Sequence, residues 1–308
     1  MHKDNFIVSV ILTTYNRSHL LLNAVNSVLK GSYKNIELII VNDCSPDNTD
    51  EVVNQIDDKR IKYIKLNKNS GVLAARNRGF DASSGDIIAI LDDDDILIPD
   101  ALEKIVAEFS QIDPKERGIL WFDCVDKESG KKSGIMPIKE GAVGFEDYVC
   151  GRIKGDFWLV FAKHVLEKHR FDERLRAHES LFWLKLHRIY PAKYIPLVVC
   201  AKFREHGERL CDLKVRMAQL PQTTLALSEY YKQFGQDVKQ LCPVVYGEKL
   251  AYLGLHQLMM GEFKLGRKSI MTSLRFRFSI KYLILYGISF FSWTEMIKKM
   301  YKMSERMT

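Results

Sequence analysis

Short apolar runs alternate with amphipathic stretches over the first hundred residues of the chain. Runs rich in Ile, Val and Leu predict buried strands over 6–12, 36–41, 61–66 and 87–91. Between them, apolar residues recur at helical spacing and predict helices over 18–30, 50–55 and 72–82. Strand and helix in repeated succession indicate right-handed crossovers, and therefore an α/β fold with an open, mostly parallel sheet.

The pattern changes twice after residue 100. Further strands are predicted over 118–122, 157–161 and 194–203, and further helices over 101–109, 163–168 and 178–187. The segment 125–144 is polar and glycine-rich, which predicts a loop or hairpin. We place a boundary near Cys211, so that residues 1–211 form the α/β domain and residues 212–308 a helical region.

Proline and glycine residues divide the helical region into several predicted helices. Its pattern is helical from residue 215 to residue 303, with breaks expected at Pro221, Pro243, Gly261 and Gly287. Residues 252–274 are predicted to form an antiparallel helix pair.

Four consecutive aspartates, Asp92 to Asp95, follow the strand predicted over 87–91. They are expected in a loop at the C-terminal edge of that strand, where open α/β sheets bind ligands. Adjacent carboxylates repel one another, and Mg²⁺ or Mn²⁺ would offset the repulsion. A solvated acidic turn that caps the next helix explains the same residues without a ligand. Thr13 and Asp43 follow the first two strands, so we expect them at the same edge.

Charge and cysteine content limit the partners and the compartment. Residues 214–308 contain 15 Lys and Arg against 6 Asp and Glu, whereas the rest of the chain is slightly acidic. This asymmetry fits an anionic partner such as lipid headgroups or nucleic acid, and it fits a solvated helical surface as well. The six cysteines form no CxxC pair, and a chain of this size needs no disulfide framework. We see no signal peptide, and the longest uncharged apolar stretch, 282–294, is too short to cross a bilayer. We therefore expect a cytoplasmic protein, with at most a peripheral attachment to the inner face of the cell membrane.

Six segments taken together resemble the family 2 glycosyltransferases, which have the GT-A fold. The resemblance covers about residues 7–206 and rests on SVILTTYNR (9–17), ELIIVND (37–43), GVLAARNRG (71–79), LDDDD (91–95), FDERL with the following HE and FWLK (171–185), and FREH (203–206). One such segment is weak evidence, whereas six in the order of the family are strong. The resemblance implies a Rossmann-like GT-A sheet and an inverting transfer of a sugar from a nucleotide-sugar, a UDP-sugar, to a glycan or lipid-linked glycan in bacterial surface polysaccharide synthesis.

The resemblance also implies a donor site. Asp43 would hydrogen-bond the uracil ring, although Asn42 stands where the family commonly has a second Asp. Asp94 would bind Mn²⁺ or Mg²⁺, with His206 as a second candidate ligand. The implied nucleotide-binding residues are Thr13, Tyr15, Asp43, Arg76, Asp92 and Asp93. Without a ligand, Thr13 would be a strand end, Asp43 a helix cap and His206 a structural histidine.

The general base is the point where this sequence departs from the family. Members usually have Glu-Asp before an aromatic-rich helix, and here the pair is His178-Glu179. Aligned on Trp183, Glu179 takes the place of the basic Asp with a side chain that is one methylene longer. Glu179 is therefore the implied base, and His178 is a weaker candidate. A helix N-terminal acid, favoured by the helix dipole, is the non-catalytic explanation of Glu179.

Two other functions also fit parts of the sequence. A catalytically degenerate GT-A scaffold in a glycan-assembly complex is supported by the altered His178-Glu179 pair. A sugar nucleotidyltransferase would need a glycine-rich, basic loop after the first strand, which residues 13–17 lack. In the helical region, cations beside aromatic residues over 275–293 fit an interfacial helix on an anionic membrane, and a helical bundle with solvated basic faces fits equally. Nucleic acid is not an expected partner.

Overall fold

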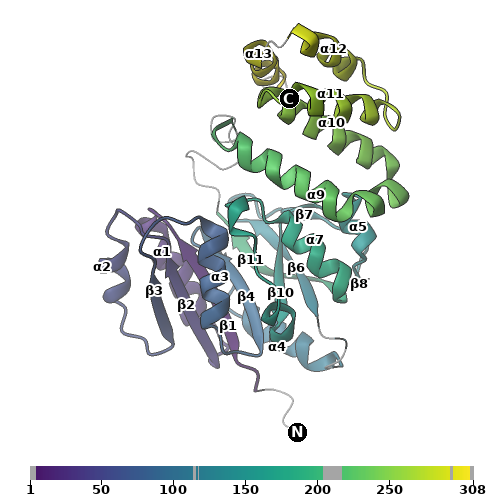
Figure 1. The fold of residues 1–308 in the computed structure, drawn as a ribbon. Helices are drawn as coiled ribbons and strands as arrows, with labels where there is room; N and C mark the ends of the chain where they lie inside the picture. Colours follow the sequence, from purple (N-terminus) through teal and green to yellow (C-terminus); the bar gives the residue numbers. More distant parts are fainter. Residues whose placement is uncertain (1–4, 114–115, 117, 204–216, 292–293, 306–308) are drawn as a thin grey trace. The chain divides into compact units, whose positions relative to one another are not determined.

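The computed structural model describes residues 5–113, 116, 118–203, 217–291 and 294–305, which belong to two compact units (Figure 1). The N-terminal unit comprises residues 1–148 and 152–206, and the C-terminal unit comprises residues 149–151 and 207–308. The boundary expected near Cys211 lies outside the described residues.

One half of the main sheet of the N-terminal unit is parallel, as predicted. Its strands are β1 (Val8–Thr14), β2 (Ile36–Asn42), β3 (Ile61–Lys65) and β4 (Ile87–Asp92), in the order β3-β2-β1-β4. The connecting helices are α1 (Ser18–Leu29), α2 (Thr49–Asn54) and α3 (Val72–Ala82). Every residue of β1 and β2 is buried, which is typical of strands covered on both faces.

The other half of the sheet is mixed. β10 (Phe157–Ala162) is antiparallel to both β4 and β6 (Ile119–Asp126), and β11 (Ala192–Lys202) is parallel to β6. Two short strands, β5 (Asp95–Leu97) and β8 (Gly141–Ala142), pair with β11. β7 (Gly134–Ile135) and β9 (Lys154–Gly155) form a separate small sheet. The helices of this half are α4 (Ala101–Gln111), α5 (Phe145–Val149), α6 (Lys163–Glu167), the 3₁₀ turn η1 (Glu173–Leu175) and α7 (Ser180–Ile189).

Two local predictions in the N-terminal unit differ from the structure. The four aspartates do not form one loop, because Asp92 ends β4 and Asp95 begins β5. Asp95 belongs to a strand because β5 pairs with β11. Only Asp93 and Asp94 therefore lie between β4 and β5. The helix expected from His178 begins two residues later, at Ser180.

The C-terminal unit is helical. Its elements are α9 (Leu220–Leu241), α10 (Pro243–Met259), α11 (Phe263–Leu274), α12 (Ile280–Ile288), the 3₁₀ turn η2 (Ser289–Phe291) and α13 (Thr294–Glu305). The predicted antiparallel pair is confirmed by α10 and α11, which approach so closely that a Cβ on Gly254 would lie 2.9 Å from the carbonyl oxygen of Gly266. Among the described residues, no helix has both the length and the hydrophobicity to cross a membrane.

The predicted helix breaks are only partly right. Pro243 begins α10, and Gly261 lies between α10 and α11. A turn at Gln219 separates the helical residues 217–218 from α9, and Pro221 lies in the first turn of α9, where its missing N–H would have no helical partner. The break expected at Gly287 falls one residue before the end of α12, and the interruption over 275–279 was not predicted.

A disulfide between Cys150 and Cys242 joins two parts of the C-terminal unit. Their Cα atoms are 5.7 Å apart, although 92 residues separate them in the sequence. The pair differs from the expectation that a chain of this size needs no disulfides, and no spacing pattern in the sequence links the two positions.

A buried carboxylate fixes the turn that leads into β4. Glu37 on β2 accepts hydrogen bonds from the hydroxyl of Ser9 and from the backbone N–H groups of Ser84 and Gly85, and it pairs with Lys62. Burial opposes its ionisation, but the hydrogen bonds from Lys62, Ser9 and Ser84 outweigh it and lower the pKa to about 2.

Glu37 predicts a loss of stability in acid. Its folded-state pKa lies below the ordinary value of 4.5, so its contribution is present above about pH 4.5 and is lost as the pH falls toward 2. Glu37→Gln should lower the free energy of unfolding at pH 7 by about 2–3 kcal/mol and flatten its pH dependence in that window, measured by urea denaturation. Glu51→Gln, on the exposed face of α2, is the control. Equal pH dependence in the two variants would contradict the assignment.

Candidate functional site

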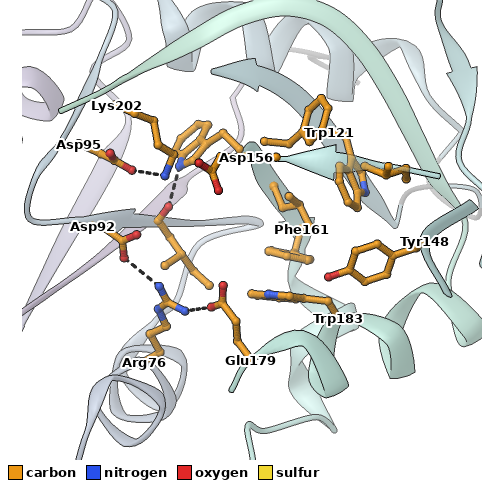
Figure 2. Close-up of a pocket in the computed structure, with 16 residues that line it drawn as sticks. Arg76, Asp92, Asp95, Trp121, Tyr148, Asp156, Phe161, Glu179, Trp183 and Lys202 are labelled. Carbon is orange, nitrogen blue, oxygen red and sulfur yellow. Dashed lines mark hydrogen bonds and ion pairs between the residues drawn. The ribbon is translucent and has the colours of Figure 1, made fainter. Parts of the chain in front are cut away.

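A cavity of about 230 Å³ opens at the edge of the sheet where β4 and β11 end and β10 begins (Figure 2). Arg76, Asp92, Asp95 and Lys202 lie on one side, and Trp121, Tyr148, Phe161 and Trp183 lie on the other, as Figure 2 shows. The charged residues are Arg76, Asp92, Asp95, Asp156, Glu179 and Lys202. The aromatic residues are Trp121, Tyr148, Phe157, Trp158, Phe161 and Trp183.

The parallel strands bring the predicted donor residues to one edge. Thr13 on β1 lies in register with Val41 on β2 and with Asp92 on β4. The backbone N–H of Asp43 donates to the carbonyl oxygen of Thr14, 3.0 Å away. The expected convergence of Thr13, Asp43 and the aspartates is therefore confirmed.

Arg76 connects the two sequence motifs that matter most to the site. Its side chain, 8% exposed, donates from Nη2 to Oδ1 of Asp92 at 2.8 Å and from Nη1 to Oε2 of Glu179. Burial alone would lower the pKa of the guanidinium. The negative charges of Glu179 and Asp92 outweigh burial, so the pKa lies above its ordinary value. The close packing of α3 on β1 helps to place Arg76, since a Cβ on Gly79 would lie 2.3 Å from Ile11. One buried cation thus orients two carboxylates.

The aspartates divide into a cluster and a separate residue. Asp92, Asp94 and Asp95 each offer an oxygen, and these oxygens lie within 4.8 Å of one another. Asp93 instead accepts a hydrogen bond from the hydroxyl of Thr14 at 2.8 Å. Three carboxylate oxygens so arranged are the donor set that Mg²⁺ or Mn²⁺ prefers, and the residues present therefore fit a divalent cation.

Fixed cations offset part of this negative charge. Arg17 Nη1 lies 3.2 Å from Asp93 and 3.1 Å from Asp94, and Lys202 Nζ lies 2.6 Å from Asp95. Burial, reinforced by the neighbouring carboxylates, nevertheless raises the pKa of Asp93 to about 6 and also raises the pKa values of Asp94 and Asp95. The pKa of Asp92 is lowered despite its burial, because Arg76 and Lys202 stabilise its charge.

Glu179 occupies the N-cap position of α7, but its side chain does not cap the helix. Its carbonyl oxygen accepts from the N–H groups of Phe182 and Trp183, which starts the helix, whereas its carboxylate makes no capping hydrogen bond. The side chain is 42% exposed and turns to Arg76 at the wall of the pocket. In the described part of the chain, Oε1 has no hydrogen-bond partner. The neighbouring His178 does not line the pocket, and burial lowers its pKa.

Two predicted donor residues, Asp43 and Tyr15, do not line this pocket. Both carboxylate oxygens of Asp43 accept backbone hydrogen bonds, from Ser70 N at 2.7 Å and Gly71 N at 2.8 Å, which holds the loop before α3. Each oxygen keeps a second lone pair for a ligand. Tyr15 is exposed at the end of β1, and His206 lies among the residues that the structure does not describe.

Sequence reasoning missed several residues of the site. Arg17 belongs to the segment 9–17, but its pairing with Asp93 spans 76 residues and has no local signal. Lys202 directly precedes the segment 203–206, which was the only available hint. Tyr148 and Trp121 come from parts of the chain without any motif.

The comparisons with known proteins agree with one another. A model described as glycosyl transferase family 2 matches residues 9–115. The chain is 28% identical, over 96% of both chains, to the GalNAc(5)-diNAcBac-PP-undecaprenol beta-1,3-glucosyltransferase of Campylobacter jejuni. It is 41% identical to the UDP-Glc:alpha-D-GlcNAc-diphosphoundecaprenol beta-1,3-glucosyltransferase WfgD of Escherichia coli, over 32% of this chain and 40% of that one.

The fold agrees with a solved structure. The crystal structure of S. aureus TarS 1-349 in complex with UDP-GlcNAc matches 96% of this chain and 92% of that one, with a TM-score of 0.61 and 16% identity. At that identity the match shows the fold alone, and it confirms the predicted GT-A fold.

The buried bridge predicts that Arg76 cannot be replaced by lysine without cost. One ammonium group cannot hold two carboxylates in the way that a guanidinium does. Arg76→Lys should therefore lower the free energy of unfolding by about 1–2 kcal/mol, measured by urea denaturation. Arg78→Lys, at an exposed position of the same helix, should change it by less than about 0.5 kcal/mol. Equal losses in the two variants would argue against a bridging role.

Proposed function

The chain belongs to the family 2 glycosyltransferases, and we propose that it transfers a hexose or N-acetylhexosamine from a UDP-sugar to a lipid-diphosphate-linked glycan. The observation that carries the proposal is the Arg76 bridge, which holds Asp92 and Glu179 at one pocket. The names of the C. jejuni and E. coli relatives give undecaprenol-diphosphate-linked sugars as their acceptors, and the TarS crystal contains UDP-GlcNAc. We place the reaction in the assembly of a bacterial surface polysaccharide.

The nucleotide is assigned to the edge formed by β1, β2 and β4. Asp43 would read the uracil ring, with Thr13 and Tyr15 beside it, and Asp92 would lie near the ribose. Support comes from the register that places Thr13 beside Asp92 and from the free lone pairs of Asp43. Asp93 contributes indirectly, because it holds Thr14 and Arg17.

A divalent cation, Mn²⁺ or Mg²⁺, is assigned to the cluster of Asp92, Asp94 and Asp95. Bound there, it would neutralise charge on the donor diphosphate and on the departing UDP. Asp94 is the leading ligand because Asp92 and Asp95 pair with the more buried cations Arg76 and Lys202, whereas Arg17, which pairs with Asp94, is 39% exposed. His206 remains a predicted ligand.

Glu179 is assigned as the general base. Arg76 holds Oε2, so Oε1 is left to accept the hydrogen bond of an acceptor hydroxyl. The hydroxyl oxygen then attacks the anomeric carbon of the donor while the bond from that carbon to the phosphate oxygen breaks. UDP leaves with the bonding electron pair, and the hydroxyl proton passes to Glu179. A single displacement inverts the anomeric configuration.

The donor and metal assignments are tested by a panel of UDP-, GDP- and dTDP-sugars in thermal melts with and without Mn²⁺. A ligand that binds only the folded chain raises its stability by about 2.7 kcal/mol at a hundred times its Kd. We expect a UDP-sugar to raise the melting temperature only with Mn²⁺, and Asp94→Asn to abolish that shift. Asp100→Asn, at a surface ion pair with Lys104, is the control and should retain it. A Mn²⁺-dependent melting shift in Asp94→Asn as large as that of the unmodified chain would refute the metal assignment.

If Glu179 is the general base, its replacement should lower turnover without weakening donor binding. Glu179→Gln keeps the shape and removes the base, so turnover should fall about 10²–10⁴-fold while donor affinity stays nearly unchanged. His178→Ala should be much milder, because His178 does not line the pocket. Both variants are compared by UDP release with one donor and one acceptor. An inactive histidine variant beside an active glutamine variant would move the base to His178.

An anionic membrane surface is the partner that we propose for the C-terminal unit. The stretch 263–294 contains six Lys and Arg residues and no Asp or Glu. Its helices also leave large apolar side chains exposed, namely Phe278, Ile280, Leu283, Ile284, Phe290 and Phe291. Exposed apolar groups among cations match the boundary between anionic headgroups and acyl chains, although Arg277 is paired with Glu248 of α10. Such a surface would bring the chain to a lipid-linked acceptor.

Vesicle sedimentation tests this surface. The chain should bind vesicles of phosphatidylcholine with 30% phosphatidylglycerol, bind pure phosphatidylcholine poorly, and lose affinity in salt. Phe278→Ser combined with Ile284→Ser should weaken binding at least about 10-fold, because each serine removes apolar surface that the membrane would bury. Val244→Ser, at an exposed position of α10, is the control. Equal binding of the double variant and the control would exclude this surface.

A further inference from the structure

The aromatic side of the pocket has no role in the proposed displacement itself. Trp121 lies at its centre, with ring centroids 5.4 Å from Phe157 and 5.7 Å from Tyr148. Phe161 stacks on Trp183 at 5.3 Å and an interplanar angle of 8°. These contacts hold the rings in fixed orientations beside Glu179, and they form a preformed apolar wall at the charged site.

Two indole nitrogens of the wall are already satisfied within the protein. Trp121 Nε1 donates to His187 Nε2 at 2.7 Å, and Trp158 Nε1 donates to the carbonyl oxygen of Ile90 at 2.6 Å. Both residues are only 3% exposed, so they support the wall and donate no hydrogen bond to a ligand, whereas the half-buried rings of Phe157 and Tyr148 remain accessible. A pyranose ring suits such a wall, because its C–H groups pack on aromatic rings while its hydroxyl groups remain available to polar partners.

Tyr148 supplies a polar group on this side. Its side chain is half-buried, and Figure 2 shows its hydroxyl directed toward the part of the pocket that holds Trp183 and Glu179. The hydroxyl has no hydrogen-bond partner among the described residues. Burial, reinforced by the charge of Glu179, raises the pKa of this phenol, so it keeps its proton as a donor. Asp156, exposed at the pocket wall, adds a carboxylate acceptor.

The order of the strands separates this wall from the donor site. Thr13 and Asp43 lie at the end of β1 and just after β2, whereas Trp121 and Phe157 lie on β6 and β10, on the far side of β4. Glu179 lies with the charged residues that face the wall. A sugar on the aromatic wall would therefore approach Glu179 from the side away from the nucleotide, which is the side that in-line displacement requires of the acceptor.

We infer that the aromatic side of the pocket is the subsite for the terminal sugar of the acceptor, and that Tyr148 donates a hydrogen bond from its hydroxyl to that sugar. The inference rests on the proposed function and deepens it. It assigns acceptor binding to the wall that Trp121, Phe157 and Trp183 help to form, and to a hydroxyl on α5. Tyr148 is thus a substrate-binding residue, while Glu179 remains the base.

Steady-state UDP release by the full chain tests the inference. The donor is the UDP-sugar found in the melting panel, with Mn²⁺, and the acceptors are α-GlcNAc and α-GalNAc joined through diphosphate to a short phenoxyalkyl chain. Tyr148→Phe removes only the hydroxyl, so the KM for the acceptor should rise about 3–15-fold, the range for one lost hydrogen bond. The KM for the donor and the slow hydrolysis of the donor without acceptor should stay unchanged. Phe157→Leu, which removes ring surface, should raise the acceptor KM as well.

Tyr33→Phe is the matched control, because its hydroxyl donates to the carbonyl oxygen of Phe6, and neither residue lines the pocket. An unchanged acceptor KM in Tyr148→Phe overturns the inference, and so does a change in its donor KM or donor hydrolysis. Donor hydrolysis that none of the acceptors accelerates also overturns it, and leaves the donor half of the proposed function intact. A chain that neither binds nor hydrolyses any UDP-sugar would instead refute the proposed function itself.

Discussion

The structure of the site depends on one guanidinium group held out of water between two carboxylates. Arg76 reaches Asp92, 16 residues away, and Glu179, 103 residues away, from a single position on α3. A buried cation is stable only when it is paired, so the two acidic segments must approach it together. That constraint fixes the distance between the aspartates at the end of β4 and the acid before α7. The proposed general base, Glu179, and the proposed donor-binding residue Asp92 are thereby placed by the same side chain.

The pocket has a charged side and an aromatic side, which suit different parts of the proposed substrates. On one side, Arg17 and Lys202 offset part of the charge of Asp93, Asp94 and Asp95, and the proposed divalent cation would offset more of it. On the other side, aromatic rings hold one another in place and leave the Tyr148 hydroxyl to a ligand. The proposed reaction would need both environments, one for a charged leaving group and one for an uncharged sugar. The order of the strands keeps them apart, since β4 separates β1 and β2 from β10 and β6.

The sequence predicted what local pattern controls. The strands β1 to β4 and the helix α3 followed from apolar runs and helical spacing, and α3 was predicted with its observed bounds. The convergence of Thr13, Asp43 and Asp92 followed from parallel pairing alone. Glu179 required the family resemblance. The antiparallel insertion of β10, the pairing of β5 with β11 and the Cys150–Cys242 disulfide were not predictable, because each joins segments without a shared local pattern. For the same reason, Arg17, Lys202 and Tyr148 became visible only in the fold.

A double-mutant cycle on turnover tests most directly whether Arg76 acts through Glu179. It compares the unmodified chain, Arg76→Lys, Glu179→Gln and the double variant with the same UDP-sugar and acceptor. If Arg76 orients the base, the double variant should be at least about 10-fold more active than the product of the two single losses implies, which is a coupling of about 1.4 kcal/mol or more. Losses that multiply to within about twofold would show that Arg76 and Glu179 act independently, and would contradict the role of Arg76 in orienting the base.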